Sequence, residues 1–494
     1  MGNFTFKGLF LAGLFMVLGC LSIQAADDDG LITEQVTVKM YKAGILLDKI
    51  GANKKFKITN LKIIGKINGT DFRVIREMAG NDAWGNKTDG MLSVLDLSDA
   101  KIVKGGDYYY NYHTHFGSLS CYTSNDKIGD HAFRGCSGLT SLTLPSGVTE
   151  IGEGAFRGCS GLTSLTLPSG LTKIGNEAFE DCIGLTSLTL PSGVTEIGEC
   201  TFYGCSGLTS LTLPSGVTEI DDHAFSGCIG LTSITLPSGL TEIRTSAFLG
   251  CKGLTSLTLP SGVTKIGDQA FSSCSGLTSL TLPSGLTVIG DYAFSSCSGL
   301  TNLTLPSDLT EIGNYVFRGC SGLTSLTLPS GLTKIGNEAF EDCIGLTSLT
   351  LPSGVTWIGS SAFKGCIGLT SLTFPFSVTF LGGSAFKDCS GLTSIYVYTE
   401  KLPETGVNVF NGCDAKKCTV YVPKGTYDDY WLSEFGYFEN IVEFDPTGIN
   451  NVITSNDAKE LSRYSLNGQR LSAPTKGLNI VKYSDGSVKK VVVQ

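Results

Sequence analysis

The sequence is poor in the residues that catalytic, metal-binding and nucleic-acid-binding sites use. Only 16% of the 494 residues are charged, the formal net charge is −9, and there are four histidines. A nucleic-acid-binding protein normally presents a basic face, so this charge balance argues against that class. No histidine stands in a catalytic-triad or metal-ligand spacing, and the acidic residues are scattered along the chain. We therefore expect no enzyme activity, no metal and no cofactor.

Long apolar runs are also scarce. One covers residues 8–21, after a lysine and before a pair of alanines. This pattern is typical of an export signal over residues 1–26, cleaved after about Ala25. Residues 17–20 also resemble a bacterial lipobox, which would make Cys20 a lipidated first residue, and both routes stay open. No later run reaches the about 20 apolar residues of a transmembrane helix.

The chain is rich in glycine, with 63 residues, and in internal repetition. From Lys127 to Cys413 the same pattern returns with a constant period of about 23 residues, within the range of known solenoid repeats. Residues 157–195 and 318–356 are identical over 39 positions. A fixed period of this length predicts a solenoid, because one coil alone cannot bury its apolar face.

Each repeat predicts two short strands. In residues 162–167, leucines alternate with Ser and Thr, which is the pattern of a half-buried strand. Pro168 ends this strand, and residues 171–174 form the second one. We expect a 3₁₀ or one-turn helical return at Ala178 and Phe179. About twelve coils stacked about 4.8 Å apart would form a rod about 55 Å long.

Cysteines recur at one position of the repeat. Stacked cysteines point the same way, whereas a disulfide needs facing Cβ atoms, so we expect a column of small, buried, reduced thiols. Cys413 and Cys418 fall outside this column and could form a bridge across the end of the solenoid. The column consists of residues 136, 159, 182, 205, 228, 251, 274, 297, 320, 343, 366 and 389.

The repeat reads I-G-x-x-A-F-x-G-C-x-G-L-T-S-L-T-L-P-S-G-V-T over about 290 residues. It closely resembles the BspA-like, or Treponema pallidum-type, leucine-rich repeats of Bacteroidetes surface proteins. The resemblance implies a β-rich (α/β) leucine-rich-repeat solenoid with parallel short strands, capped at both ends. It also implies an exported protein that binds extracellular matrix or other cells.

The flanks are similar to those of the same family. Residues 58–76 predict strand, turn and helix, and residues 92–100 predict another strand. Near the end of the chain, apolar residues alternate around Asn-Gly and Asp-Gly, which predicts β-hairpins. This end is similar to a type IX sorting domain, although shorter. The predicted units are a signal peptide at 1–26, an N-terminal cap at 27–125, repeats at 126–413, a C-terminal cap at 414–445, and a linker with the sorting-like β segment at 446–494.

One column of the repeat singles out a candidate binding site. Most of its members are Glu or Lys, so the column is expected to face solvent, but Trp357 and Phe380 interrupt it in adjacent coils. Phe376 replaces the usual Ser of a nearby turn. Clustered exposed aromatic side chains are typical of contact sites. The alternative is that the C-terminal cap folds back over them. The column is 150, 173, 196, 219, 242, 265, 288, 311, 334, 357 and 380.

Two other motifs have simpler explanations. Residues 402–406 spell the sortase pentapeptide LPETG, but about 90 residues follow it where a sortase substrate has an apolar span, so we expect coincidence. His113 and His115 would share one face of a strand and could hold a metal weakly. A solvated cap loop is the simpler interpretation.

The sequence thus predicts a non-catalytic adhesion protein on a bacterial surface. Its ligand would be a host matrix protein, a glycoprotein or a neighbouring cell surface. The alternative is a carbohydrate-capturing protein whose exposed aromatic side chains stack on sugar rings. A third hypothesis is ice binding by the outward Ser-x-Thr ladder of the first strand.

Overall fold

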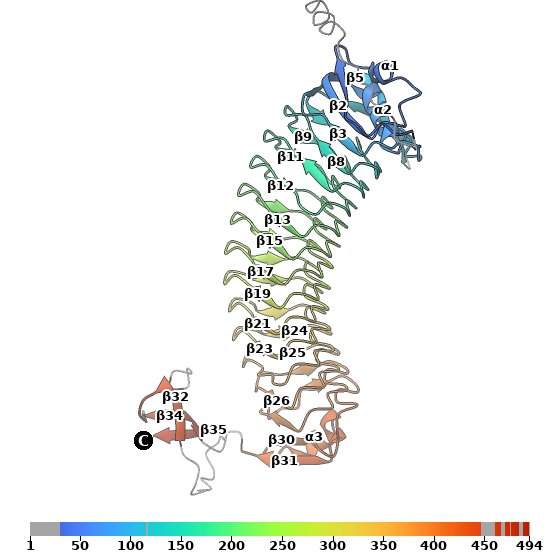
Figure 1. Cartoon of the computed structure of the whole chain (residues 1–494). Coiled ribbons are helices and arrows are strands. Elements are labelled where there is room, and N and C mark those ends of the chain that lie inside the picture. The colour runs from blue at the N-terminus through green and yellow to red at the C-terminus, as the bar shows by residue number, and fades with distance from the viewer. Residues whose placement is uncertain are drawn as a thin grey trace, which may run out of the picture.

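The structure is a computed structural model that describes residues 30–114, 117–445, 460–465, 470–474, 476–483 and 488–493. The predicted export signal, with Cys20, lies outside the described residues. The repeats stack into an elongated, curved rod with a different unit at each end (Figure 1). This is the parallel leucine-rich-repeat solenoid that the sequence predicts.

The N-terminal cap begins the same sheet that the repeats continue. Its strands pair in parallel and lead directly into the first coils, in the order β1-β2-β3-β8-β10. Asn68 and Asp71 form a capping box at the start of the helix α2, as the strand, turn and helix pattern predicts. The elements are β1 (Val36–Met40), α1 (Leu46–Ile50), β2 (Asn60–Ile67), α2 (Gly69–Met78), β3 (Val94–Asp96), β4 (Ala100–Ile102), β5 (Gly105–Thr114) and β6 (Gly117–Thr123).

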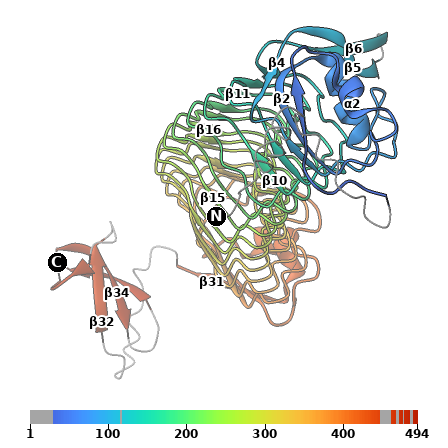
Figure 2. The same cartoon turned by 45° about the horizontal axis from the view of Figure 1, so that its top comes forward.

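In most coils a first strand carries the Ser-x-Thr ladder, while residues 187–189 and 348–350 form no strand. Its central leucine or isoleucine is buried, and it aligns in register with the same residue of a neighbouring coil wherever strands pair. The coils follow one another closely when the rod is viewed obliquely (Figure 2). These strands are β8 (Ser141–Thr143), β10 (Ser164–Thr166), β13 (Ser210–Thr212), β15 (Ser233–Thr235), β17 (Ser256–Thr258), β19 (Ser279–Thr281), β21 (Asn302–Thr304), β23 (Ser325–Thr327), β26 (Ser371–Phe374) and β28 (Ser394–Val397).

The second strand of each coil has two residues, of which the first faces outward and the second is usually buried. Its outward position is the mostly charged column of the sequence. These strands are β7 (Lys127–Ile128), β9 (Glu150–Ile151), β11 (Lys173–Ile174), β12 (Glu196–Ile197), β14 (Glu219–Ile220), β16 (Glu242–Ile243), β18 (Lys265–Ile266), β20 (Val288–Ile289), β22 (Glu311–Ile312), β24 (Lys334–Ile335), β25 (Trp357–Ile358), β27 (Phe380–Leu381) and β29 (Glu404–Thr405).

The return segment differs from its prediction, because it is a series of turns and contains no helix. Glu177 has a left-handed φ of 55°, which interrupts any helix. The Phe179 N–H donates to the Thr201 carbonyl of the next coil at 2.9 Å, while the Cys182 N–H donates back to Phe179 at 3.1 Å. Alternate N–H groups therefore bind the next coil, which a helix cannot permit.

The core is a set of stacked columns. Phenylalanines in successive coils lie nearly parallel, as for Phe248 and Phe271, whose centroids are 5.4 Å apart. Each column thiol from Cys159 to Cys389 donates to a phenylalanine carbonyl, as Cys159 Sγ does to Phe133 at 3.0 Å. All the described cysteines are free. Burial raises the pKa of the column thiols, and it raises that of Cys228 to about 12. Buried reduced thiols were the prediction for this column.

Cys413 belongs to the column after all. Its thiol donates to the Phe386 carbonyl at 3.3 Å, in the manner of the other column thiols. The last coil, from Cys389 to Cys413, is slightly longer than the others, which hid the match in the sequence. Cys413 and Cys418 are both free, so the expected bridge between them is wrong.

One glycine per coil permits this close stacking. A Cβ at Gly276 would collide with the backbone carbonyl oxygen of Lys252 in the preceding coil. The equivalent position in the neighbouring coils, Gly299, meets the carbonyl of Ser275 in the same way. The backbone spacing between coils therefore requires glycine here.

The C-terminal cap covers the open end of the phenylalanine column. Phe410, the last ring of that column, contacts Phe435 at 5.0 Å and Phe438 at 5.2 Å. Tyr430 is also buried, and its hydroxyl donates to the Thr399 carbonyl at 2.8 Å. The cap contains β30 (Thr419–Pro423), α3 (Tyr427–Trp431), η1 (Glu434–Tyr437) and β31 (Asn440–Phe444).

A small antiparallel sheet follows the cap, in the order β33-β32-β34-β35. It agrees with the hairpins that the alternating apolar residues predict, although the Asn-Gly and Asp-Gly turns themselves lie outside the described residues. Its strands are β32 (Glu460–Ser465), β33 (Arg470–Leu471), β34 (Gly477–Tyr483) and β35 (Val488–Val493).

Candidate binding surface

The outward column forms its longest continuous sheet near the C-terminal end of the rod. Strands β22, β24, β25, β27 and β29 pair in this order and in register. Their outward residues are Glu311, Lys334, Trp357, Phe380 and Glu404. Two uncharged rings therefore lie side by side between charged neighbours.

Trp357 and Phe380 form a stacked pair on the surface. Their ring centroids are 3.8 Å apart and the rings are inclined by 15°. Trp357 is 42% exposed and Phe380 is partly exposed. The C-terminal cap does not cover Trp357, so the alternative in which it folds back over the pair is wrong.

A shallow groove of about 540 Å³ lies beside Trp357. We call it the Trp357 groove. It extends over the coils that precede Trp357, so it lies on the side of the indole opposite to Phe380. Its lining is polar apart from the indole. The lining residues are Glu311, Asn314, Thr333, Lys334, Gly336, Asn337, Thr356 and Trp357.

Phe376, the third aromatic residue predicted for the site, is 66% exposed. Its ring packs edge-on against Tyr398 at 5.6 Å, and not against the stacked pair. Tyr398 in turn contacts Phe444 at 5.3 Å, and Tyr396 stacks on Tyr421 at 4.5 Å. These five rings, which we call the C-terminal aromatic face, lie on the first-strand side of the last coils.

The C-terminal aromatic face was missed in the sequence. Its signal is the stretch around Tyr396 and Tyr398, where Tyr396 replaces the outward Thr of the repeat and Tyr398 replaces its Pro. A second stacked pair was also missed, although Tyr292 and Tyr315 occupy the same column position in successive coils. Their centroids are 4.2 Å apart. Both residues have a left-handed φ of about 60°, which this position adopts in most coils.

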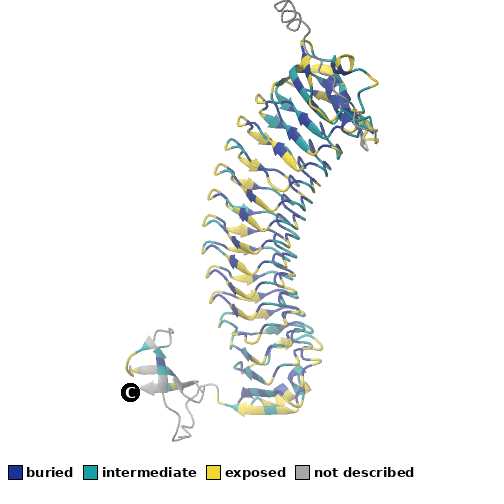
Figure 3. Ribbon diagram, in the orientation of Figure 1, coloured by how far each residue is buried: buried dark blue, intermediate teal, exposed yellow. Residues whose placement is uncertain are grey.

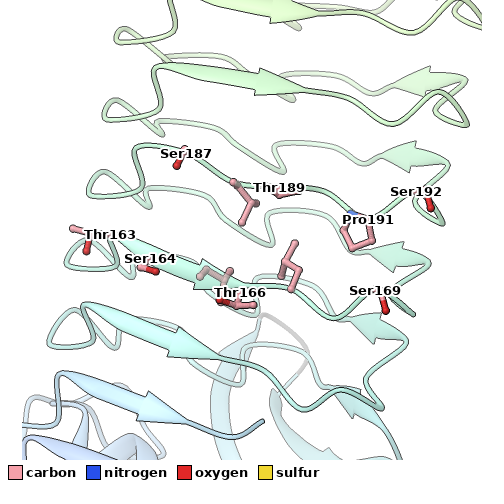
Figure 4. A pocket seen from close by; sticks show the side chains of 11 residues that line it. Thr163, Ser164, Thr166, Ser169, Ser187, Thr189, Pro191 and Ser192 are labelled. Atoms are coloured by element: carbon pink, nitrogen blue, oxygen red, sulfur yellow. The ribbon is translucent and has the colours of Figure 1, made fainter.

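The Ser-x-Thr face is not a flat, continuous ladder. Strand β10 pairs with β8 alone, and Ser187 in the next coil forms a single bridge to Ser210. A hollow of about 490 Å³ opens between the coils of β10 and Ser187, lined by Ser and Thr side chains together with leucines and Pro191 (Figure 4). Exposed residues follow the outer edge of the coils (Figure 3). Ordering of an ice-like water layer needs a regular flat array, so this face does not support the ice-binding hypothesis.

The titratable groups of the described residues do not gather into a metal site, since no three His, Cys, Asp or Glu side chains among them lie close enough. His113 lies on the strand β5, so the expected cap loop is wrong there. The side chain of His113 and the whole of His115 lie outside the described part. The buried His131 packs against Tyr112 at 4.8 Å, and burial lowers its pKa to about 4.

His131 is expected to make the junction between cap and repeats acid-sensitive. Because its folded-state pKa of about 4 lies below the ordinary value of 6.5, the unfolded chain takes up the proton first. Stability is therefore complete above about pH 6.5 and falls as the pH drops toward 4, by at most roughly 3 kcal/mol. His131→Asn should flatten this dependence, because asparagine has no titratable group. Asparagine also tolerates the left-handed φ of 56° at this position.

The measurement is urea denaturation of both proteins between pH 4 and 7. Arg134, Asp130, Glu177 and Arg157 also act on this imidazole, and they remain in the variant. An unchanged pH slope in His131→Asn would contradict this assignment.

The LPETG motif is part of the solenoid. Glu404 and Thr405 form β29, which pairs in parallel with β27. Leu402 packs against the core. Strand pairing and core packing in the last coil therefore account for these residues. Among the described residues, every helix is too short or too polar to cross a membrane.

The comparison with known families agrees with the coil geometry. A family model of the BspA type leucine rich repeat region matches residues 104–229, 195–324 and 310–429. The chain belongs to this BspA-type family. Leucine-rich-repeat solenoids of this kind are typically binding scaffolds, which supports a protein-binding repeat protein.

Solved structures of leucine-rich-repeat proteins are similar to the chain. A leucine-rich repeat protein from Bacteroides ovatus is 32% identical, with 66% of this chain and 89% of that chain covered and a TM-score of 0.55. A leucine rich cell surface protein from Faecalibacterium prausnitzii is 30% identical, with 65% of this chain and 84% of that chain covered and a TM-score of 0.42. The T. pallidum leucine-rich-repeat protein is 36% identical, with 31% of this chain and 72% of that chain covered and a TM-score of 0.30. No curated protein matches the chain.

Proposed function

We propose that this BspA-type protein is exported and acts in adhesion, with the stacked pair Trp357 and Phe380 as the centre of its contact surface. The partner is a macromolecule outside the cell: a host matrix protein, a glycoprotein or the surface of a neighbouring cell. The exposed stacked pair carries the proposal. Export rests on the leader pattern of residues 1–26, and protease shaving of intact cells tests it.

A stacked pair of this kind suits a binding site for two reasons. Tryptophan is enriched among the residues that contribute most to binding, because it buries a large area. The two rings also support each other at 3.8 Å on a paired sheet, so little side-chain freedom is lost when a partner binds. Folding alone gives no reason for an exposed ring here, since most of this column is Glu or Lys.

The chain contains its own control for Trp357. Residues 157–195 and 318–356 are identical, and the next residue is Glu196 in the first copy and Trp357 in the second. Both residues begin a second strand of the coil. Glutamate is therefore compatible with this position and with the coil that precedes it.

Trp357→Glu should reduce binding of the mature protein to its partner by at least about 10-fold while the protein stays folded. The assay is binding to immobilised fibronectin, collagen, laminin and mucin, with circular dichroism as the folding check. Val288→Glu is the matched control, because Val288 is a 46% exposed apolar residue of the same column, three coils earlier.

Full binding by Trp357→Glu would remove the stacked pair from the contact surface. An equal loss in Val288→Glu would mean that any added negative charge along the column weakens binding. The C-terminal aromatic face would then be the next surface to test.

A further inference from the structure

Trp357 is partly exposed and lines the Trp357 groove. Phe380 covers one face of the indole at a centroid distance of 3.8 Å. On the opposite side the register neighbour is Lys334, whose ammonium group lies 3.6 Å from the Glu311 carboxylate, one coil farther from the indole. The cation–π contacts of the described residues involve other rings. The indole therefore lines the Trp357 groove without a cation–π contact.

The floor of the groove carries polar groups in fixed positions. Asn337 accepts the Ser360 N–H at 2.8 Å, and Asn314 accepts the Asn337 N–H at 2.9 Å. These bonds hold both amides in place. The Asn337 amide nitrogen makes no hydrogen bond to another described residue, so its two N–H groups remain as donors on an exposed side chain.

Hydroxyl groups add fixed acceptors. The Thr333 hydroxyl donates to the Thr310 carbonyl at 3.0 Å, and the Thr356 hydroxyl donates to the Thr333 carbonyl at 3.3 Å. Because each hydroxyl proton is already used, the oxygens present lone pairs to a ligand. The Glu311 and Lys334 charges compensate each other, so the groove favours neither an anion nor a cation.

We propose that the Trp357 groove binds a neutral hexopyranose unit of a glycan. This inference rests on the proposed function and names the part of the partner that is contacted. A pyranose ring has a face of C–H groups, whose slight positive charge is attracted to the negative face of an indole. Its hydroxyl rim meets the amide donors and hydroxyl acceptors of the groove. The volume of about 540 Å³ lies within the range of small-ligand sites.

The groove is shallow, so one site binds weakly and strength comes from a repeated glycan. We expect a Kd of about 1 mM for a single oligosaccharide and tighter binding to a surface that carries many copies. Phe380 lies in the next coil and stacks on the face of the indole that is turned away from the groove. It therefore supports Trp357 and does not itself stack on the same sugar unit.

The experiment uses the full mature chain and two probes. One is a set of neutral hexaoses, each built of hexopyranose units: cellohexaose, laminarihexaose, maltohexaose and mannohexaose, titrated by calorimetry. The other is immobilised gastric mucin, intact or stripped of its glycans. Trp357→Glu should lower binding at least about 10-fold, and Val288→Glu should leave it unchanged.

A gain-of-function variant protects the test from a folding artefact. The first repeat copy carries the same Thr172, Lys173, Asn176 and Thr195, with Glu153 where the groove has Asn314, and Asn176 accepts the Glu199 N–H at 3.2 Å. The double substitution Glu196→Trp and Glu219→Phe places the stacked pair beside these residues. We expect a second site and about a twofold higher binding stoichiometry for the active sugar.

Three results would overturn the inference. The first is the absence of saturable binding to every hexaose and to intact mucin. The second is equal binding of Trp357→Glu and the unmodified protein to the sugar. The third is mucin binding that survives removal of the glycans, which would identify a protein partner and leave the proposed adhesive function in place.

Discussion

Phe248→Ala is expected to lower the free energy of unfolding by about 3–5 kcal/mol. Phe248 is completely buried and stacks on Phe225 at 5.3 Å and on Phe271 at 5.4 Å. Truncation removes both ring contacts and leaves a cavity that rigidly stacked coils cannot close. Since each coil touches only its neighbours, the loss falls on two interfaces of the rod at once.

The measurement is urea denaturation combined with hydrogen exchange. Faster exchange should be confined to the coils on both sides of residue 248, because stability in a solenoid is a sum of nearest-neighbour contributions. Val288→Ala, at a 46% exposed position of the same rod, is the control and should change stability by less than about 0.5 kcal/mol. Equal effects of the two variants would contradict the stacked core.

Phe435→Ala should uncover the end of the solenoid. The ring is completely buried and contacts Phe374, Phe410 and Tyr430, at 6.0, 5.0 and 5.2 Å. We expect a loss of about 3–5 kcal/mol, concentrated in the last coils. An uncovered end also exposes apolar surface and unpaired backbone groups, so the variant should self-associate.

Thermal unfolding and light scattering measure these two effects. Leu432→Ala is a matched control, because Leu432 lies three residues away in the same cap and is 84% exposed. A monomeric Phe435→Ala variant with unchanged melting temperature would show that the cap does not stabilise the last coil.

The repeat columns were predictable from the sequence because each one has a simple physical role. Buried leucines alternate with Ser and Thr on the first strand, and the column of Glu and Lys faces solvent on the second. The exposure of Trp357 followed from its column neighbours. The thiol column followed from the geometry that a disulfide requires.

Other features could not be read from a one-dimensional pattern. The return segment has i to i+3 turns like a 3₁₀ helix, but its alternate N–H groups bind the next coil. Cys413 lies in the thiol column although the last coil contains one extra residue, so the constant spacing of the repeat did not reveal it. Phe376 is near Phe380 in the sequence, yet it contacts Tyr398 on another side of the coil.

The repeated spacing alone determined that this chain is a stacked solenoid, since identical apolar positions in successive repeats can be buried only against their own copies. The tertiary structure decided which outward residues meet. The two faces of Trp357 differ because Phe380 stacks on one of them, while on the other side Lys334 is ion-paired with Glu311. Those contacts join coils across the stack, so no single repeat contains them.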